Sequence, residues 1–176
     1  NVSSEHTGVL NGQNLDKAFQ ELKFRTDVKE NNFTTFNFDS SDTAIGNDDC
    51  NTLALTFSNR SRTRDWTYNK EDKMYHTSDY KTDVKVKNLI VLFDNTTYVT
   101  KANYKGTGKG ETYCDYALKG GKGVVAAEGK YTEITWSKKD GKLSILDANG
   151  KDITLKVGRS WIGYASSNNG GKVVEG

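Results

Sequence analysis

The stretch from residue 122 to residue 164 most constrains the fold, because it alternates short apolar segments with hairpin-type turns. Asp140-Gly141 and Asn149-Gly150 are dipeptides that adopt positive φ at little cost, as two-residue hairpin turns require. The segments around these turns are rich in β-branched and aromatic residues, which favours strands at residues 131–136, 143–146, 153–155 and 160–164. The pattern predicts an antiparallel sheet, and it identifies no reaction.

Composition narrows the class of protein. The chain has 176 residues, enough for one domain with a real core, and its aromatic content of 11% is too high for a disordered chain. The net charge of +2 comes from 25 basic and 23 acidic residues, so no strong field favours nucleic acid. No apolar run approaches the roughly 20 residues that span a bilayer. Since the chain begins at Asn1 without a signal peptide, we expect a mature or trimmed fragment.

One helix is expected, at residues 14–24, because Leu15, Phe19 and Leu22 recur at the spacing of one helix face. Asn11 or Asn14 can cap its N-terminus. An apolar stripe of this kind normally packs on a sheet. We therefore predict an α+β, β-rich fold, a twisted antiparallel sheet of hairpins with one packed N-terminal helix. The predicted organisation is a flexible leader (1–13), a single β-rich domain (14–165) and a flexible tail (166–176).

Further strands are predicted upstream of the hairpin region, at residues 32–39, 52–57, 65–68, 73–76, 84–93 and 111–118. Residues 89–93 form a nearly continuous apolar run, which is typical of a central strand covered on both faces. Two glycine–lysine clusters, at residues 106–110 and 120–123, lack the spacing of a phosphate-binding loop. We expect turns between strands at both clusters.

The two cysteines leave two readings open. Cys50 and Cys114 each adjoin a predicted strand, and a disulfide between them would form if those strands are neighbours. The alternative is a pair of reduced thiols, because spacing alone does not decide pairing. No CxxC motif is present, and only His6 and His76 could join a cysteine in binding zinc. The sequence therefore predicts no metal site and no cofactor.

Catalytic motifs are scarce, whereas aromatic residues are plentiful. A Ser–His–Asp triad would have to use His6 or His76, and no serine has a nucleophile-elbow context. Trp66, Tyr68 and Tyr75 are candidate ligand-contact residues, because exposed rings can stack on the faces of sugars. The other tryptophans belong to alternating strands and are expected in the core.

Three strings near the C-terminus resemble the C-terminal part of the YerB-like bacterial lipoproteins. They are residues 121–138, with a Gly-Lys-Gly turn and an Ile-x-Trp-x-Lys motif, residues 147–155, and the closing segment 158–162. In that closing motif Arg159 stands where the family pattern has lysine. A weaker resemblance extends upstream, so that most of residues 6–165 are covered.

The resemblance implies an extracytoplasmic protein on the outer face of a Gram-positive-type membrane, held there by a lipid anchor absent from this chain. Such a location would favour the disulfide between Cys50 and Cys114. The resemblance carries over no catalytic residues, since the family's domains have no assigned biochemical function. It also implies that most of an N-terminal domain is missing from this chain.

From the sequence we expect a non-catalytic binding module of the cell envelope, which contacts cell-wall glycan or an envelope protein partner. An alternative is a cell-wall-active hydrolase or transferase that uses paired carboxylates such as Glu111, Asp115 and Glu133. A third reading is a structural scaffold for the missing N-terminal domain. No nucleic-acid partner is expected.

Overall fold

The computed structural model describes residues 11–27, 36–41 and 43–176. The chain divides into two compact units, Asn1–Asn32 and Phe33–Gly176. This division falls after Asn32, whereas the sequence placed a boundary after residue 13. Most of the predicted leader, including His6, lies outside the described residues.

The first unit contains helix α1 (Gly12–Glu21), which confirms the predicted helix with ends two to three residues earlier. The side chain of Asn11 accepts a hydrogen bond from the backbone N–H of Asn14 at 2.8 Å, so Asn11 is the N-cap. No residue of α1 is buried, and Leu15 and Leu22 are exposed. The packing of this helix on the sheet stays a prediction. No helix among the described residues is long and apolar enough to cross a bilayer.

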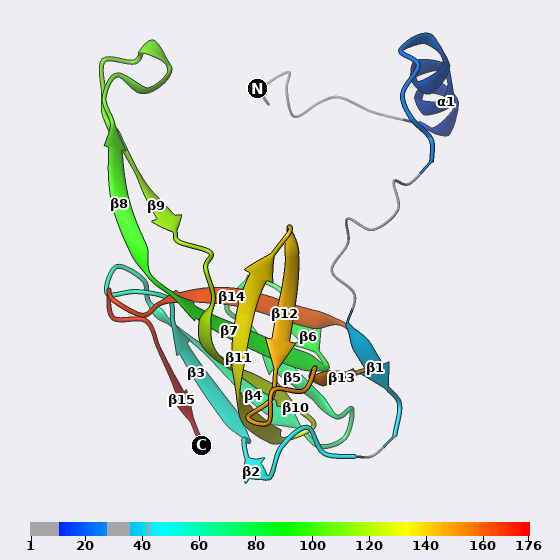
Figure 1. Cartoon of the computed structure of the whole chain (residues 1–176), viewed down its shortest axis with the longest axis vertical. Helices are drawn as coiled ribbons and strands as arrows, with labels where there is room; N and C mark the ends of the chain where they lie inside the picture. Colours follow the sequence, from blue (N-terminus) through cyan, green and yellow to red (C-terminus); the bar gives the residue numbers. More distant parts are fainter. Residues whose placement is uncertain (1–10, 28–35, 42) are drawn as a thin grey trace. The chain divides into compact units, whose positions relative to one another are not determined.

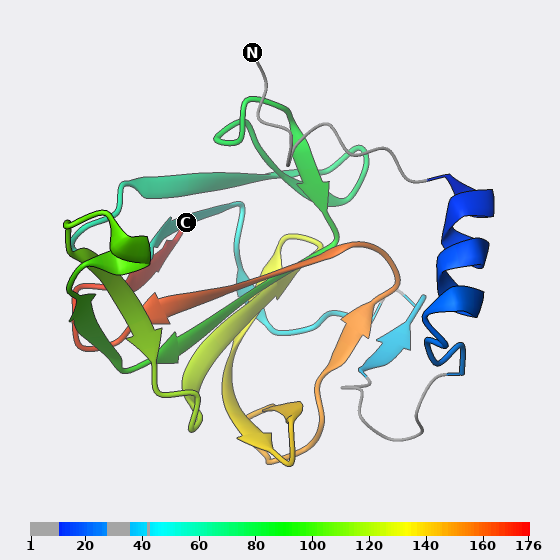
Figure 2. The same cartoon turned by 90° about the horizontal axis from the view of Figure 1, so that it is seen from above.

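The second unit is built on a six-stranded sheet (Figures 1 and 2). Its strands in spatial order are β12 (Lys142–Leu146), β11 (Lys130–Lys139), β10 (Gly121–Ala127), β7 (Asn88–Asp94) and β14 (Ser160–Ser166), and β2 (Asp48–Asp49) pairs with β11. All pairs are antiparallel except β14 with β7, which is parallel. The hairpin between β11 and β12 turns at Asp140-Gly141, both at positive φ, as the sequence predicted.

A five-stranded antiparallel sheet and two small sheets complete the second unit. The larger one has the order β15 (Lys172–Glu175), β3 (Thr52–Thr56), β4 (Thr63–Asn69), β5 (Met74–Thr77) and β6 (Val84–Val86). The small ones pair β1 (Asn37–Asp39) with β13 (Thr154–Lys156) in parallel, and β8 (Thr96–Lys101) with β9 (Glu111–Tyr116) antiparallel. A short 3₁₀ turn, η2 (Tyr104–Gly106), lies between β8 and β9. The β-rich class is therefore confirmed.

Strand β7 is central and is covered on both faces, as its apolar run predicted. Leu89 and Val91 belong to the core cluster that joins the two large sheets. Ile90 and Leu92 belong to a second cluster on the opposite face, where Leu155 of β13 also packs. Because side chains alternate along a strand, one apolar run supplies both cores.

Four strands were missed from the sequence, namely β2, β8, β10 and β15. Of these, β10 and β15 correct explicit predictions. Residues 120–123 were expected to form a turn, but β10 begins at Gly121 and runs through the middle of the sheet. A Cβ atom at Gly121 would lie 2.7 Å from the carbonyl oxygen of Phe93, and one at Gly123 would lie 2.5 Å from that of Val91. These glycines let the backbones of β10 and β7 approach each other closely, and they do not form a turn.

The predicted flexible tail also contains a strand. β15 pairs with β3 over four residues, so the prediction of a flexible segment is wrong for Lys172–Glu175. The turn before it uses Gly170 at φ 78°, and the backbone N–H of Gly171 donates to the carbonyl of Ser166 at 2.8 Å. The other two missed strands are β2 and β8.

Candidate functional site

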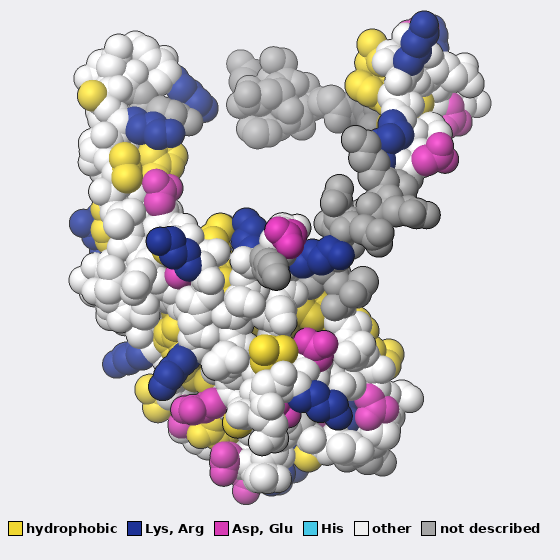
Figure 3. Space-filling view, viewed as in Figure 1, with side chains coloured by type: hydrophobic (Ala, Val, Ile, Leu, Met, Phe, Trp, Pro, Cys, Tyr) yellow, Lys and Arg dark blue, Asp and Glu magenta, His cyan; other side chains and the backbone are white. Residues whose placement is uncertain are grey.

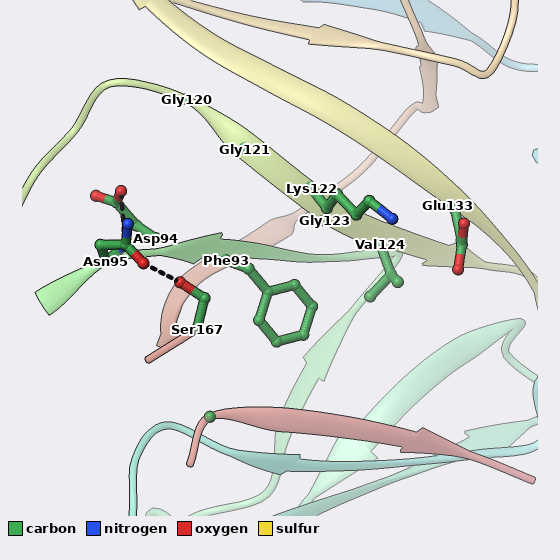
Figure 4. Close-up of a pocket in the computed structure, with 11 residues that line it drawn as sticks. Phe93, Asp94, Asn95, Gly120, Gly121, Lys122, Gly123, Val124, Glu133 and Ser167 are labelled. Atoms are coloured by element: carbon green, nitrogen blue, oxygen red, sulfur yellow. Dashed lines mark hydrogen bonds between the residues drawn. The ribbon is translucent and has the colours of Figure 1, made fainter. Parts of the chain in front are cut away.

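A cleft of about 440 Å³ opens where β7 ends and β10 begins. We call it the glycine cleft, because Gly120, Gly121 and Gly123 contribute to one wall. Residues 93–95 form a second wall, and Glu133, Ser167 and Gly171 close the rim (Figure 4). Its lining therefore comes from the end of β7, from the β10–β11 hairpin and from the residues between β14 and β15.

Two opposite charges stand on one face of the cleft wall. Val124 is paired with Glu133 across β10 and β11, and Lys122 lies two residues before Val124, so all three side chains share one face of the sheet. Lys122 and Glu133 are both exposed. Within the described part of the chain, neither side chain makes a hydrogen bond or an ion pair. Both are therefore available to a ligand.

The apolar part of the cleft comes from Phe93 and Val124. Val124 is buried in the core cluster between the large sheets, and the half-buried ring of Phe93 packs against that cluster. Figure 4 shows the phenyl ring at the wall of the cleft. A ring fixed by the core offers a rigid apolar surface.

The rim of the cleft is held by Asp94. Its buried carboxylate accepts hydrogen bonds from the backbone N–H groups of Asn95 at 2.9 Å and Leu118 at 2.6 Å. The side-chain oxygen of Asn95 accepts a further bond from the hydroxyl of Ser167 at 2.8 Å (Figure 4). Asp94 is therefore engaged in holding the backbone, whereas the amide nitrogen of Asn95 remains for a ligand.

The aromatic residues predicted to contact a ligand lie elsewhere. Trp66 and Tyr75 are fully buried, which corrects the prediction for both. The Trp66 ring packs 5.6 Å from that of Trp161, and the hydroxyl of Tyr75 donates to the carbonyl of Cys50 at 2.7 Å. Burial raises the pKa of Tyr75.

Tyr68 is half-buried and does not line the glycine cleft either. Its ring lies 5.4 Å from that of Tyr75, and it passes so close to Gly129 that a Cβ atom there would be 2.7 Å away. The three rings fill the sheet interface because this chain has few large aliphatic residues. The expectation of a core position is confirmed for Trp136, which is 3% exposed.

The two cysteines are unpaired in the structure, which corrects the possible disulfide. Cys50 is buried in the short connection between β2 and β3, and Cys114 is exposed on β9. β3 and β9 belong to different sheets, so the strands beside the two cysteines are not neighbours, which was the condition for the disulfide. Burial raises the pKa of the Cys50 thiol.

The carboxylates proposed for catalysis are not brought together at one cleft. Glu133 lines the glycine cleft, whereas Glu111 and Asp115 lie on β9 and do not line it. Four steps along a strand separate those two residues by about 13 Å, beyond the spacing of a glycosidase pair. The Nε2 atom of His76 lies 2.7 Å from a carboxylate oxygen of Asp72, away from the cleft lining. No cluster of three metal-ligating side chains occurs in the described residues.

A local concentration of positive charge is found at the end of the β8–β9 ribbon. Lys101, Lys105 and Lys109 lie in or beside the connection between the two strands, where basic side chains gather in the space-filling view (Figure 3). The amino group of Lys101 lies 5.0 Å from the ring centroid of Tyr113. The near-neutral composition of the whole chain conceals this feature.

The glycine cleft was missed because its signal was ambiguous. A run of glycines with one lysine favours a turn when only local sequence is considered. A continuous apolar run, however, follows the cluster directly, at residues 124–127. Reading the cluster together with this apolar run would have indicated the strand.

Comparison with known proteins identifies the family. The model of the C-terminal domain of DUF3048, described as a protein of unknown function, matches residues 53–162. The match covers well over half of the chain, which therefore belongs to this family. No curated protein matches the chain.

The fold is that of a solved relative. The crystal structure of the YerB protein from Bacillus subtilis superimposes with a TM-score of 0.63 at 16% identity, covering 93% of this chain and 53% of that chain. At this identity the likeness concerns the fold alone. The chain spans about half the length of YerB. The resemblance to YerB-like proteins, stated from the sequence, is confirmed.

Proposed function

We propose that this domain is a non-catalytic binding module of the bacterial cell envelope, and that its glycine cleft binds a segment of cell-wall glycan. The observation that carries the proposal is the composition of the cleft: one fixed aromatic ring, Phe93, beside the polar groups of Lys122, Glu133 and Asn95. The volume of about 440 Å³ lies within the range of small-molecule sites.

The chemistry of these groups suits a sugar. The C–H face of a pyranose packs on an aromatic ring, while its hydroxyls donate to carboxylates and accept from ammonium and amide groups. Glu133 supplies the acceptor, and Lys122 and the amide nitrogen of Asn95 supply donors. The backbone of Gly120 and Gly121 lets a ligand approach closely, because no side chain projects there.

The proposed location rests on the family resemblance. The resemblance implies a lipoprotein on the outer face of a Gram-positive-type membrane, a location that would bring the domain close to the cell wall. An extracytoplasmic site, a lipid anchor and a Gram-positive source are parts of the same proposal. The free thiols of Cys50 and Cys114 provide no support for this location.

Co-sedimentation with purified peptidoglycan sacculi tests the proposal. We expect the wild-type chain to pellet with sacculi without releasing soluble muropeptides, and the double substitution Lys122→Gln with Glu133→Gln to bind at least fivefold less. Lys138→Gln, with Glu71→Gln, is a control of equal charge change at exposed positions outside the cleft. Release of muropeptides by the wild type would favour the hydrolase reading. Absence of binding would reject the glycan and direct the search to an envelope protein.

A further inference from the structure

A second pocket, of about 220 Å³, lies beside the end of β13 and is lined by three lysines. We call it the lysine pocket; its basic residues are Lys73, Lys87 and Lys156, and its acidic residues are Asp39 and Glu128. It shares no residue with the glycine cleft. An inference about it is therefore independent of the proposed function.

The ammonium group of Lys156 is buried with incomplete neutralisation. The residue is 4% exposed, and its Nζ atom donates one hydrogen bond, to the carbonyl oxygen of Ser41 at 2.7 Å. A lysine ammonium has three N–H donors, so two remain. No carboxylate of a described residue lies within ion-pair distance of this group. The nearby carboxylate of Asp39 interacts with this charge but forms no ion pair with it. A buried charge without a direct ion pair is costly, and an anion in the pocket would lower that cost.

The backbone of Lys156 is fixed by a fully buried asparagine. The Oδ1 atom of Asn88 accepts from the Lys156 N–H at 2.8 Å, and its Nδ2 atom donates to the Lys156 carbonyl at 2.8 Å. Nδ2 also donates to the hydroxyl of Ser160 at 3.0 Å. This clamp sets the position from which the Lys156 side chain extends.

Lys87 is positioned just as closely. Its Nζ atom lies 3.2 Å from a carboxylate oxygen of Glu128 and donates to the carbonyl of Lys73 at 3.0 Å, which leaves one donor. Its aliphatic stem passes over Gly158, where an added Cβ would lie 2.5 Å from Lys87 Cγ. The side chain is 17% exposed and is held by its surroundings.

The acidic groups of the pocket are already engaged. The carboxylate of Asp39 accepts bonds from the hydroxyl and the backbone N–H of Ser41, and these bonds hold its pKa below the usual range. Glu128 is paired with Lys87. Both carboxylates of the lining are therefore engaged, whereas Lys156 and Lys87 keep N–H donors that can bind an anion.

We propose that the lysine pocket binds a phosphate group through the ammonium groups of Lys156 and Lys87. Lysine binds phosphate as a point charge, and a tetrahedral oxyanion can accept the remaining donors of both side chains at once. The fixed backbone at Asn88 and the passage over Gly158 mean that the site needs little reordering to accept the anion.

An NMR titration of the full chain with sodium phosphate at constant ionic strength and pH 7 tests this proposal. We expect saturable shifts of the backbone amides of Asn88, Lys156 and Val157, and binding at least tenfold weaker in Lys156→Met. Methionine keeps the length and the apolar packing of the buried stem while removing the charge. The matched control, Lys138→Met, removes an exposed lysine outside the pocket and should bind as the wild type does.

The following results would count against phosphate binding in the lysine pocket or require a second variant. Shifts that do not saturate, or that persist unchanged in Lys156→Met, would overturn the proposal. Sodium acetate provides the second arm: if it binds as tightly as phosphate, the pocket takes carboxylates, and the assignment to phosphate is wrong. If Lys156→Met does not fold, Lys87→Met replaces it, with a loss of at least fivefold expected.

Discussion

The aromatic interface between the two large sheets and the glycine cleft at the end of those sheets use their side chains in opposite ways. At the interface, Trp66 and Tyr75 are fully buried and contribute to stability. In the cleft, Lys122 and Glu133 are exposed and make no hydrogen bond or ion pair with the described residues. The comparison teaches that the residues most suggestive of binding in this sequence serve the fold. Those available for binding are ordinary charged residues.

Substitution of Trp66 should have the largest effect and should act on stability alone. Trp66→Ala removes a ring packed against Trp161, and we expect a loss of about 3–5 kcal/mol in the free energy of unfolding. Urea unfolding followed by circular dichroism measures it. Trp66→Phe is the control and should cost less, since the indole N–H has no partner among the described residues. An unchanged stability in Trp66→Ala would mean that the ring is not in the core.

Substitution of Asn88 tests how much a buried polar side chain contributes to the stability of this core. Asn88→Ala leaves the N–H and the carbonyl of Lys156 without their partners, and we expect a loss of about 1–3 kcal/mol in unfolding free energy. Asn51→Ala, at an exposed position, should change it by less than about 0.5 kcal/mol. Equal effects of the two substitutions in chemical denaturation would contradict the buried clamp.

Gly123 tests the backbone contact that builds the cleft wall. A Cβ at this position would lie 2.5 Å from the Val91 carbonyl, so Gly123→Ala must shift β10 away from β7. We expect a loss of about 1–3 kcal/mol, measured by thermal or urea unfolding. In Gly12→Ala, where nothing lies within 4 Å, no loss is expected, because alanine favours a helix. Stability gained in Gly123→Ala would argue against the close approach.

Substitution of Lys122 or Glu133, the exposed charges of the cleft, should reduce binding and leave stability unchanged. Lys122→Gln and Glu133→Gln, made singly, should each change the unfolding free energy by less than about 0.5 kcal/mol, since both side chains are exposed. Sedimentation with sacculi should nevertheless fall for each. Paired measurements of unfolding and binding on the same preparations check this separation. A parallel loss of stability and binding would remove the distinction between cleft and core.

The smallest expected effect is a pH dependence at the Asn149-Gly150 turn. The backbone N–H of Lys151, with that of Asn149, holds the pKa of Asp147 below its usual value. A lowered native pKa stabilises the fold above the unfolded pKa of about 3.9, and the contribution is lost as the pH falls through the native value. The stability difference between the wild type and Asp147→Asn should therefore shrink below about pH 4. A difference constant from pH 3 to pH 7 would exclude this origin.

The sequence was most informative where structure is local. The Asp140-Gly141 hairpin and the apolar run of β7 each depend on a few consecutive residues, and both were predicted correctly. The N-cap, Asn11, is one of the two caps that the sequence offered. The candidate sites, in contrast, depend on contacts between residues that are distant in the sequence. The lining of the glycine cleft comes from segments up to 78 residues apart, between Phe93 and Gly171, and no local window contains them.

What the sequence by itself determined is therefore the β-rich class, the principal hairpins, the central strand and the family. Only the tertiary structure decided that residues 121–123 begin a sheet strand, that β15 adds to the second sheet, and that Cys50 and Cys114 are unpaired. It also decided which aromatic rings are buried. The physical reason is that turns and caps are set by the conformational preferences of neighbouring residues, whereas burial and strand partners depend on backbone pairings between distant segments, such as β7 with β14.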